Sequence, residues 1–447
     1  MAKADGPLVH ASSPSLAGSP SAARRASTPV LTSLALVILA GWAAAPVAAQ
    51  VVPQPEGEPA AAVPGAHLEV FLMTMGPGDI FWERFSHNSL VIRDDLAGTE
   101  IAYNWGMFDF NEADFIGRLA RGRMRYWMAG YPSGAVAEVY RRANRSVTVQ
   151  RVYLTPAERL ELQAHIRETD TEANRYYRYD YYRDNCSTRV RDVLDRVLGG
   201  QIRAATDGLP TEATYRWHTA RLLEPVLAAY AGIQFVVGNR GDQPISVWDE
   251  MFLPIPLQQH LGEVLIDTPD GGRAPLLGPA VQVVDAQREA VPGAAPNMLV
   301  GFLVAGCLIG LFFGVAGRYA ARGGRWAVWL LALAGCGWSL VIGLLGSALL
   351  ASWVFTDHYF WGLNENVFQA SPVSLALAGL LLLAAAGRGG MWIGRTARAV
   401  AGLAAVGLAL QILPGFDQVN GEILALTVPA HFGLAWGVLE AWPSVKG

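Results

Sequence analysis

Long apolar runs fill the sequence after Asn297, and they limit the possible folds more than any other feature. Only the fifth run contains a charged residue, Glu440. A helix needs about 20 apolar residues to cross a bilayer, so the third and fourth runs are short and the second is long enough to tilt. The sequence therefore predicts an all-α bundle of about five transmembrane helices. The runs cover residues 298–317, 326–355, 371–387, 399–415 and 423–442.

Charged residues between these runs indicate their orientation. Arginines follow the first and third runs and Lys446 follows the fifth, whereas loops 356–370 and 416–422 contain neither Lys nor Arg. Because positively charged loops remain in the cytoplasm, residues 50–296 are predicted to lie outside it. The arginines are Arg318, Arg322, Arg325, Arg388, Arg395 and Arg398.

The N-terminus has the pattern of a secretory signal. Arg24 and Arg25 precede the apolar stretch 30–45, and small residues up to Ala49 offer a cleavage site. Cleavage after Ala49 is predicted, with retention as an anchor as the alternative. The predicted units are a leader and signal peptide, a Pro/Ala linker, a periplasmic domain and a transmembrane domain. They cover residues 1–49, 50–66, 67–296 and 297–447.

Cys186 is the only cysteine outside the apolar runs, because Cys307 and Cys336 lie within them. It therefore has no disulfide partner in its own domain, and it is either reactive or buried and inert. Asn185 is a good N-cap, which places Cys186 at the first position of a helix that ends at Gly199. A helix N-terminus favours thiolate, so a lowered thiol pKa is expected. The Cys186 and Ser187 amides would form an oxyanion hole.

His87 is the preferred base for such a thiol, because it begins a strand between small polar residues. Strands are predicted near 67–77, from His87, and near 100–110, and a simple hairpin register puts Asn104 or Gly106 beside His87. Thr155 is predicted to cap a helix, and residues 241–257 are read as an extended lid or docking segment. The other periplasmic histidines, His67, His165, His218 and His260, are assigned to the linker border, the surface or the core.

Five motifs resemble the Lnb family of bacterial lipoprotein N-acyltransferases, and the resemblance runs from about His67 to the C-terminus. It implies an α+β fold: a permuted papain-like (NlpC/lecithin:retinol acyltransferase-like) periplasmic domain followed by the helical membrane bundle. The motifs are "WERFSHNSLVIRD", "AYNWGMFDF", "RYDYYRDNCSTRVRD", "ISVWDEMFLP" and "DHYFWGLNENVFQASP".

The resemblance also implies an activity and its catalytic residues. Cys186 would be the nucleophile and His87 the base, with Asn104 or Tyr103 orienting the imidazole. A fatty acyl chain would pass from a phospholipid to Cys186, and then to the α-amine of the lipidated N-terminal cysteine of a diacylated apolipoprotein. The protein would sit in the bacterial inner membrane with its catalytic domain in the periplasm, and no cofactor or metal is implied.

Several assignments stay open at this point. Arg189 either binds phosphate or pairs with Asp192 or Asp195, and His358 either positions a headgroup, meets the soluble domain or caps a helix. The Cys–His pair also suits a cell-wall peptidase or amidase, or a phospholipase, and an inactive membrane-anchored scaffold is a third reading. The net charge of −4 gives no support to nucleic-acid binding.

Overall fold

The computed structural model describes residues 63–288 and 291–443. The predicted signal peptide, its cleavage site and most of the linker lie outside the described residues. The domain boundaries therefore remain predictions.

A seven-stranded sheet forms the centre of the soluble domain, and each strand runs antiparallel to its neighbours. The three predicted strands and the His87 start are confirmed. In sheet order the strands are β11 (Val281–Val284), β5 (Val147–Val152), β1 (Leu68–Met75), β2 (His87–Asp94), β3 (Thr99–Met107), β4 (Arg125–Pro132) and β6 (Tyr176–Arg178).

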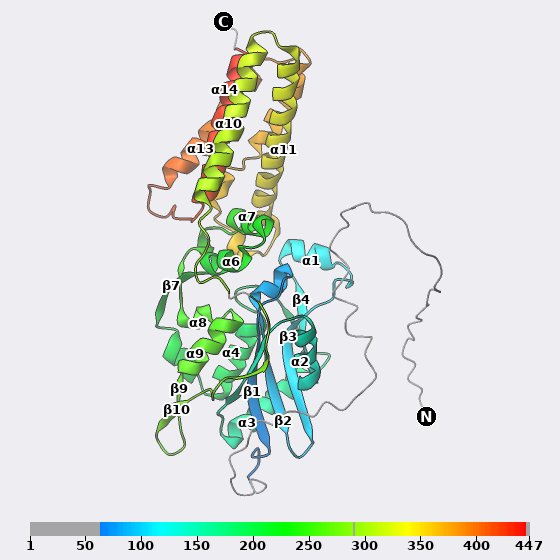
Figure 1. Cartoon of the computed structure of the whole chain (residues 1–447), viewed down its shortest axis with the longest axis vertical. Helices are drawn as coiled ribbons and strands as arrows, with labels where there is room; N and C mark the ends of the chain where they lie inside the picture. Colours follow the sequence, from blue (N-terminus) through cyan, green and yellow to red (C-terminus); the bar gives the residue numbers. More distant parts are fainter. Residues whose placement is uncertain (1–62, 289–290, 444–447) are drawn as a thin grey trace, which may run out of the picture. The chain divides into compact units, whose positions relative to one another are not determined.

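Side chains alternate along the central strands, so apolar residues project from both faces of the sheet. Each face is covered by its own apolar core. On β2, Leu90 and Ile92 belong to one apolar core and Val91 to the other. The first core packs against α3 (Pro156–Thr169), α4 (Cys186–Val197) and α9 (Pro254–Glu263), and the second against α2 (Ser133–Arg142). Figure 1 shows α2 and α4 beside these strands. The result is a mixed α+β domain, whereas a papain-like permutation stays a prediction.

A local capping signal fixes the start of α3 as expected. Thr155 and Glu158 form the predicted capping box of α3.

The extended conformation predicted for residues 241–257 is wrong, because this segment forms β8 (Pro244–Ser246), α8 (Val247–Glu250) and the start of α9. Ser246 caps α8, and Pro254 occupies the first turn of α9, where proline favours a helix start over an extended chain.

Smaller elements complete the soluble domain. They are η2 (Phe81–Phe85), α1 (Phe115–Arg121), α5 (Gln201–Thr206), β7 (Pro210–Thr214), α6 (Tyr215–Leu223), α7 (Leu227–Val236), η3 (Asn239–Gly241), β9 (Leu265–Asp267) and β10 (Arg273–Pro275).

Four helices in the described part of the chain are long and apolar enough to cross a membrane. They are α10 (Leu299–Ala321), α11 (Arg325–Phe355), α13 (Trp392–Leu410) and α14 (Gly421–Ala441). The predicted third span is α12 (Val373–Ala385), whose 13 residues cover only about 20 Å of the roughly 30 Å apolar core. The count of five spans therefore stays a prediction. The short helices η4 (Tyr359–Trp361) and η5 (Glu365–Val367) lie in the loop before α12.

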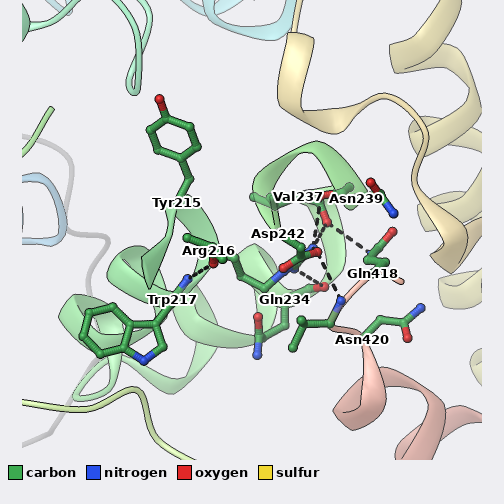
Figure 2. Close-up of polar contacts among 12 residues, drawn as sticks. Tyr215, Arg216, Trp217, Gln234, Val237, Asn239, Asp242, Gln418 and Asn420 are labelled. Atoms are coloured by element: carbon green, nitrogen blue, oxygen red, sulfur yellow. Dashed lines mark hydrogen bonds and ion pairs between the residues drawn. The ribbon is translucent and has the colours of Figure 1, made fainter. Parts of the chain in front are cut away.

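A buried ion pair of the soluble domain contacts the loop that precedes α14. Arg216 on α6 is 2% exposed, and its Nε and second terminal nitrogen donate to the Asp242 carboxylate at 2.6 and 2.9 Å. Asp242 also accepts from the Val419 backbone N–H at 3.1 Å, just before α14. Gln418 donates to the Val237 carbonyl oxygen at 3.2 Å (Figure 2). These contacts fix the loop that begins α14 against α6, α7 and η3.

Candidate active site

Cys186 occupies the first position of α4, as predicted, and Asn185 holds it there. The Asn185 side-chain oxygen accepts the Ser187 and Thr188 backbone N–H groups at 2.8 and 3.0 Å. Its amide nitrogen donates to the Phe252 carbonyl oxygen at 3.0 Å. Asn185 therefore positions the helix start between β2 and the segment before α9.

The sheet opens next to Cys186. The pairing of β2 with β3 stops at Leu90–Tyr103, and β3 is irregular between Asn104 and Met107. Gly106 adopts a φ of 95°, and a Cβ there would lie 3.6 Å from the Cys186 Cβ. The positive φ favours glycine at this position, whereas a contact of 3.6 Å would leave room for a Cβ.

His87 and Asn104 lie on the two sides of this opening. The His87 Nε2 is 3.2 Å from the Asn104 Oδ1, while the Asn104 amide nitrogen donates to the Ala102 carbonyl oxygen at 2.9 Å. This second bond fixes the orientation of the amide, so Nε2 carries the proton and Nδ1 is free to accept one. The backbone N–H of Asn88, the next residue, points at the Cys186 sulfur. The structure thus brings Cys186, His87 and Asn104 to one end of the sheet, and both reactive side chains are partly exposed.

The thiol and the imidazole are both neutral in this environment. Burial raises the pKa of Cys186 from 9.0 to about 11, although the backbone N–H groups of Asn88, Ser187 and Cys186 itself lower it. Burial and the positive charge of Arg145 lower the pKa of His87 from 6.5 to about 4, against the opposing effect of Asn104. The expectation of a lowered thiol pKa is therefore wrong, because loss of hydration outweighs the helix N-terminus.

The predicted oxyanion hole also needs a correction. The Ser187 N–H donates to the Asn185 cap at 2.8 Å, so it is not free for a substrate oxygen. The Ser187 hydroxyl instead bridges the Asn88 side-chain oxygen at 3.1 Å and the Met251 carbonyl oxygen at 2.9 Å. Among the described residues no acceptor binds the Cys186 N–H, so the amides of Cys186 and Asn88 are the ones aimed at the reacting atoms.

Two further predicted residues lie away from the catalytic atoms. Burial raises the pKa of Tyr103, and the nearby charges of Asp170 and Asp94 raise it further. Asp170 follows the end of α3 and Asp94 is the last residue of β2, so the Tyr103 ring lies on the side away from the opening. Of the two alternatives, Asn104 therefore contacts His87. Arg189 forms a bidentate pair with Asp184, rather than with Asp192 or Asp195, and its guanidinium carbon lies 4.3 Å from the centre of the Tyr177 ring.

His358 joins the external loop to the soluble domain. Its Nε2 donates to the Leu119 carbonyl oxygen on α1 at 3.0 Å, and its ring stacks on Trp361 with centres 3.8 Å apart. The structure thus shows the second of the three roles considered for this residue, contact with the soluble domain.

Sequence reasoning missed Arg145 and Tyr140, which lie beside the reactive pair. Arg145 is buried, donates to the Gly76 carbonyl oxygen at 2.8 Å and lies over the Tyr140 ring at 4.5 Å. The Tyr140 ring is parallel to the His87 ring, with centres 6.5 Å apart. Arg145 is one of several arginines in its segment, so only the fold identifies it as a positive charge near both reactive groups.

Residues 58–224 match the family model described as the Lnb N-terminal periplasmic domain. This match supports an Lnb-family protein with a periplasmic N-terminal domain. The match includes Cys186, His87 and Asn104, and together with the four candidate spans it fits a membrane protein with an Lnb periplasmic domain. No curated protein and no solved structure matches the chain.

Proposed function

We propose that this Lnb-family protein is a lipoprotein N-acyltransferase of the bacterial inner membrane. The observation that carries the proposal is the convergence of a helix-terminal thiol, an imidazole with a free Nδ1 and an orienting amide at one end of a membrane-anchored domain. A diacylated apolipoprotein and a phospholipid are both held in the bilayer by their acyl chains, at about 0.8 kcal/mol per buried methylene. An enzyme acting on both therefore benefits from a cleft fixed to the membrane.

The first half of the reaction loads the enzyme. The Cys186 sulfur attacks the ester carbonyl carbon of the phospholipid while its proton passes to the His87 Nδ1. The carbon–oxygen bond to glycerol then breaks, and the departing alkoxide takes the proton from His87. The products are a Cys186 thioester and a lysophospholipid. Because both groups are neutral at rest, proton transfer accompanies attack instead of preceding it.

The second half transfers the acyl chain. The neutral α-amine of the apolipoprotein cysteine attacks the thioester carbonyl carbon and gives a proton to His87. The carbon–sulfur bond breaks, and His87 returns the proton to the sulfur. An amide has formed and the thiol is regenerated, so neither a redox partner nor a cofactor is consumed.

The neighbouring groups account for the rate enhancement in order-of-magnitude terms. A positioned imidazole contributes about 10²–10⁴ in rate. An amide donor to the developing oxyanion contributes about 10²–10³, and the Cys186 N–H, which has no acceptor among the described residues, is available for this. Asn104 keeps the proton on Nε2, so that Nδ1 can accept one.

The test is mass spectrometry of a lipoprotein N-terminal peptide from a strain depleted of its own N-acylation. Wild-type protein and a Cys307→Ala control should add an acyl chain to the amine, and Cys186→Ala should not. A diacylated peptide in every strain would reject the assignment. Release of free fatty acid from phospholipid without N-acylation would favour a phospholipase, and cleavage of peptidoglycan would favour a cell-wall hydrolase. Full function in Cys186→Ala would favour a scaffold.

A further inference from the structure

Exposed apolar side chains gather on one part of the soluble domain, around η2 and α1. We define the α1 patch as Phe81, Trp82, Phe110, Ile116 and Leu119, all exposed in the structure. We propose that the α1 patch inserts into the outer leaflet of the bilayer and admits the acyl chain of the lipid donor to Cys186. The second part of this inference rests on the proposed function, whereas the first part does not.

The level of α1 relative to the membrane follows from its contacts with α11. The apolar helix α11 ends at Phe355, and the following residues therefore lie at the headgroup region. The Asp357 backbone N–H donates to the Arg121 carbonyl oxygen at 2.9 Å, and His358 donates to the Leu119 carbonyl oxygen at 3.0 Å. Arg121 and Leu119 belong to α1, so this short helix lies at the membrane surface.

The two sides of α1 differ in the way that an interfacial helix requires. Phe115 is buried against the domain, whereas Ile116 is 71% exposed. Arg118 and Arg121 are paired with Glu112 and Asp114, so neither guanidinium is left without a counter-charge. The exposed side chains of the α1 patch leave apolar area in water, and insertion into lipid removes this area from water.

A row of aromatic rings leads from the patch toward the thiol. Trp82 and Phe110 have ring centres 5.6 Å apart, and Phe110 and Phe108 4.9 Å. The row continues from Phe108 to Tyr126 at 5.0 Å and from Tyr126 to Tyr179 at 4.2 Å.

The far end of the row adjoins the reactive cysteine. Burial raises the pKa of Tyr179, and the neighbouring Tyr126 and Cys186 raise it further. Partly exposed aromatic rings thus continue from the patch to the neighbourhood of the nucleophile, which suits an acyl chain.

The first experiment measures the depth of the patch. A spin label is attached to Ile116→Cys in full-length protein with Cys186→Ser, Cys307→Ala and Cys336→Ala, reconstituted in phospholipid nanodiscs. The matched control is Leu96→Cys, because Leu96 is 76% exposed in the turn at the end of β2 remote from His87. We expect label 116 to collide more with oxygen than with a water-soluble nickel complex, and label 96 to do the reverse. Aqueous behaviour at position 116 would overturn insertion.

The second experiment tests passage of the acyl chain. Ile116→Asp combined with Leu119→Asp should lower the rate of Cys186 acylation by phospholipid at least tenfold, whereas Leu96→Asp should not. Alkylation of Cys186 by iodoacetamide should be unchanged in both, which shows that the site is folded. Unchanged acylation in the double variant would overturn the acyl path. If wild-type protein forms no acyl-enzyme, the proposed function fails, and the depth measurement alone decides insertion.

Discussion

The neutral state of Cys186 makes a quantitative prediction about its reactivity. Burial raises its pKa from 9.0 to about 11, and His87, with a pKa near 4, is uncharged at neutral pH. The site therefore holds no thiolate–imidazolium pair before substrate binds. The perturbation that tests it is pH, applied to protein whose other two cysteines are replaced by alanine.

The magnitude follows from the two pKa values. A rise from 9.0 to about 11 disfavours the thiolate by about 2.7 kcal/mol, or about a hundredfold, at any pH well below 9. Since thiolate is the form that reacts with iodoacetamide, the folded protein should react about a hundredfold more slowly than the same chain in guanidinium at pH 7.5. The rate should rise tenfold per pH unit from pH 7 to pH 10.

The assay is the pseudo-first-order rate of Cys186 carbamidomethylation, followed by peptide mass spectrometry. His87→Ala should leave the profile nearly unchanged, because no ion pair is lost. A rate that stays constant between pH 5 and pH 8 in the wild type and collapses in His87→Ala would refute the reasoning. That result would show a preformed ion pair.

Substitutions of Asn104, Asn185 and Arg216, with controls at Thr155 and Arg203, test the supporting contacts. Asn104→Ala should slow acyl transfer about tenfold, equivalent to one hydrogen bond of about 1.4 kcal/mol, whereas Asn104→Asp should raise the pKa of the imidazole and move the acid limb of the pH–rate profile to higher pH. Asn185→Ala should lower the free energy of unfolding by about 1 kcal/mol and also slow acylation. The control Thr155→Ala removes the cap of another helix, so it should lower the free energy of unfolding by as much and leave acylation intact. Denaturant titration measures the first quantity and the acylation rate the second. Arg216→Met should lower the free energy of unfolding by about 3–5 kcal/mol because it leaves a buried carboxylate unpaired. The ion pair of Arg203 is exposed, so Arg203→Met should lower the free energy of unfolding by less than about 1 kcal/mol. Equal losses in Arg216→Met and Arg203→Met would contradict the role of the junction.

The features predictable from the sequence depend on local interactions. Asn185 and Thr155 cap their helices through neighbours within three residues, and those neighbours are visible in the chain. The hairpin of β2 and β3 is also local, so its short turn predicts that the end of β3 near Asn104 lies close to His87, although the strand pairing itself stops at Leu90–Tyr103.

Other features depend on contacts between distant segments. The pKa of Cys186 is set by burial under elements far away in sequence, which a helix N-terminus alone does not reveal. Arg145 reaches the site only because β5 lies beside β1. Arg216 and Asp242 are 26 positions apart in the sequence, and Gln418 and Val237, which share a hydrogen bond, are 181 positions apart. No spacing or composition signal in the sequence identifies these contacts.

The most direct test of the central claim is the mass of the enzyme itself. Purified protein in phospholipid nanodiscs, without apolipoprotein, should acquire one fatty acyl chain on the Cys186 peptide, removable by hydroxylamine and by addition of a diacylated lipopeptide. Cys186→Ala should acquire none, and Cys307→Ala should behave as wild type. N-acylation of the lipopeptide by Cys186→Ala at the wild-type rate would contradict the account, because the chain could then not pass through this thiol.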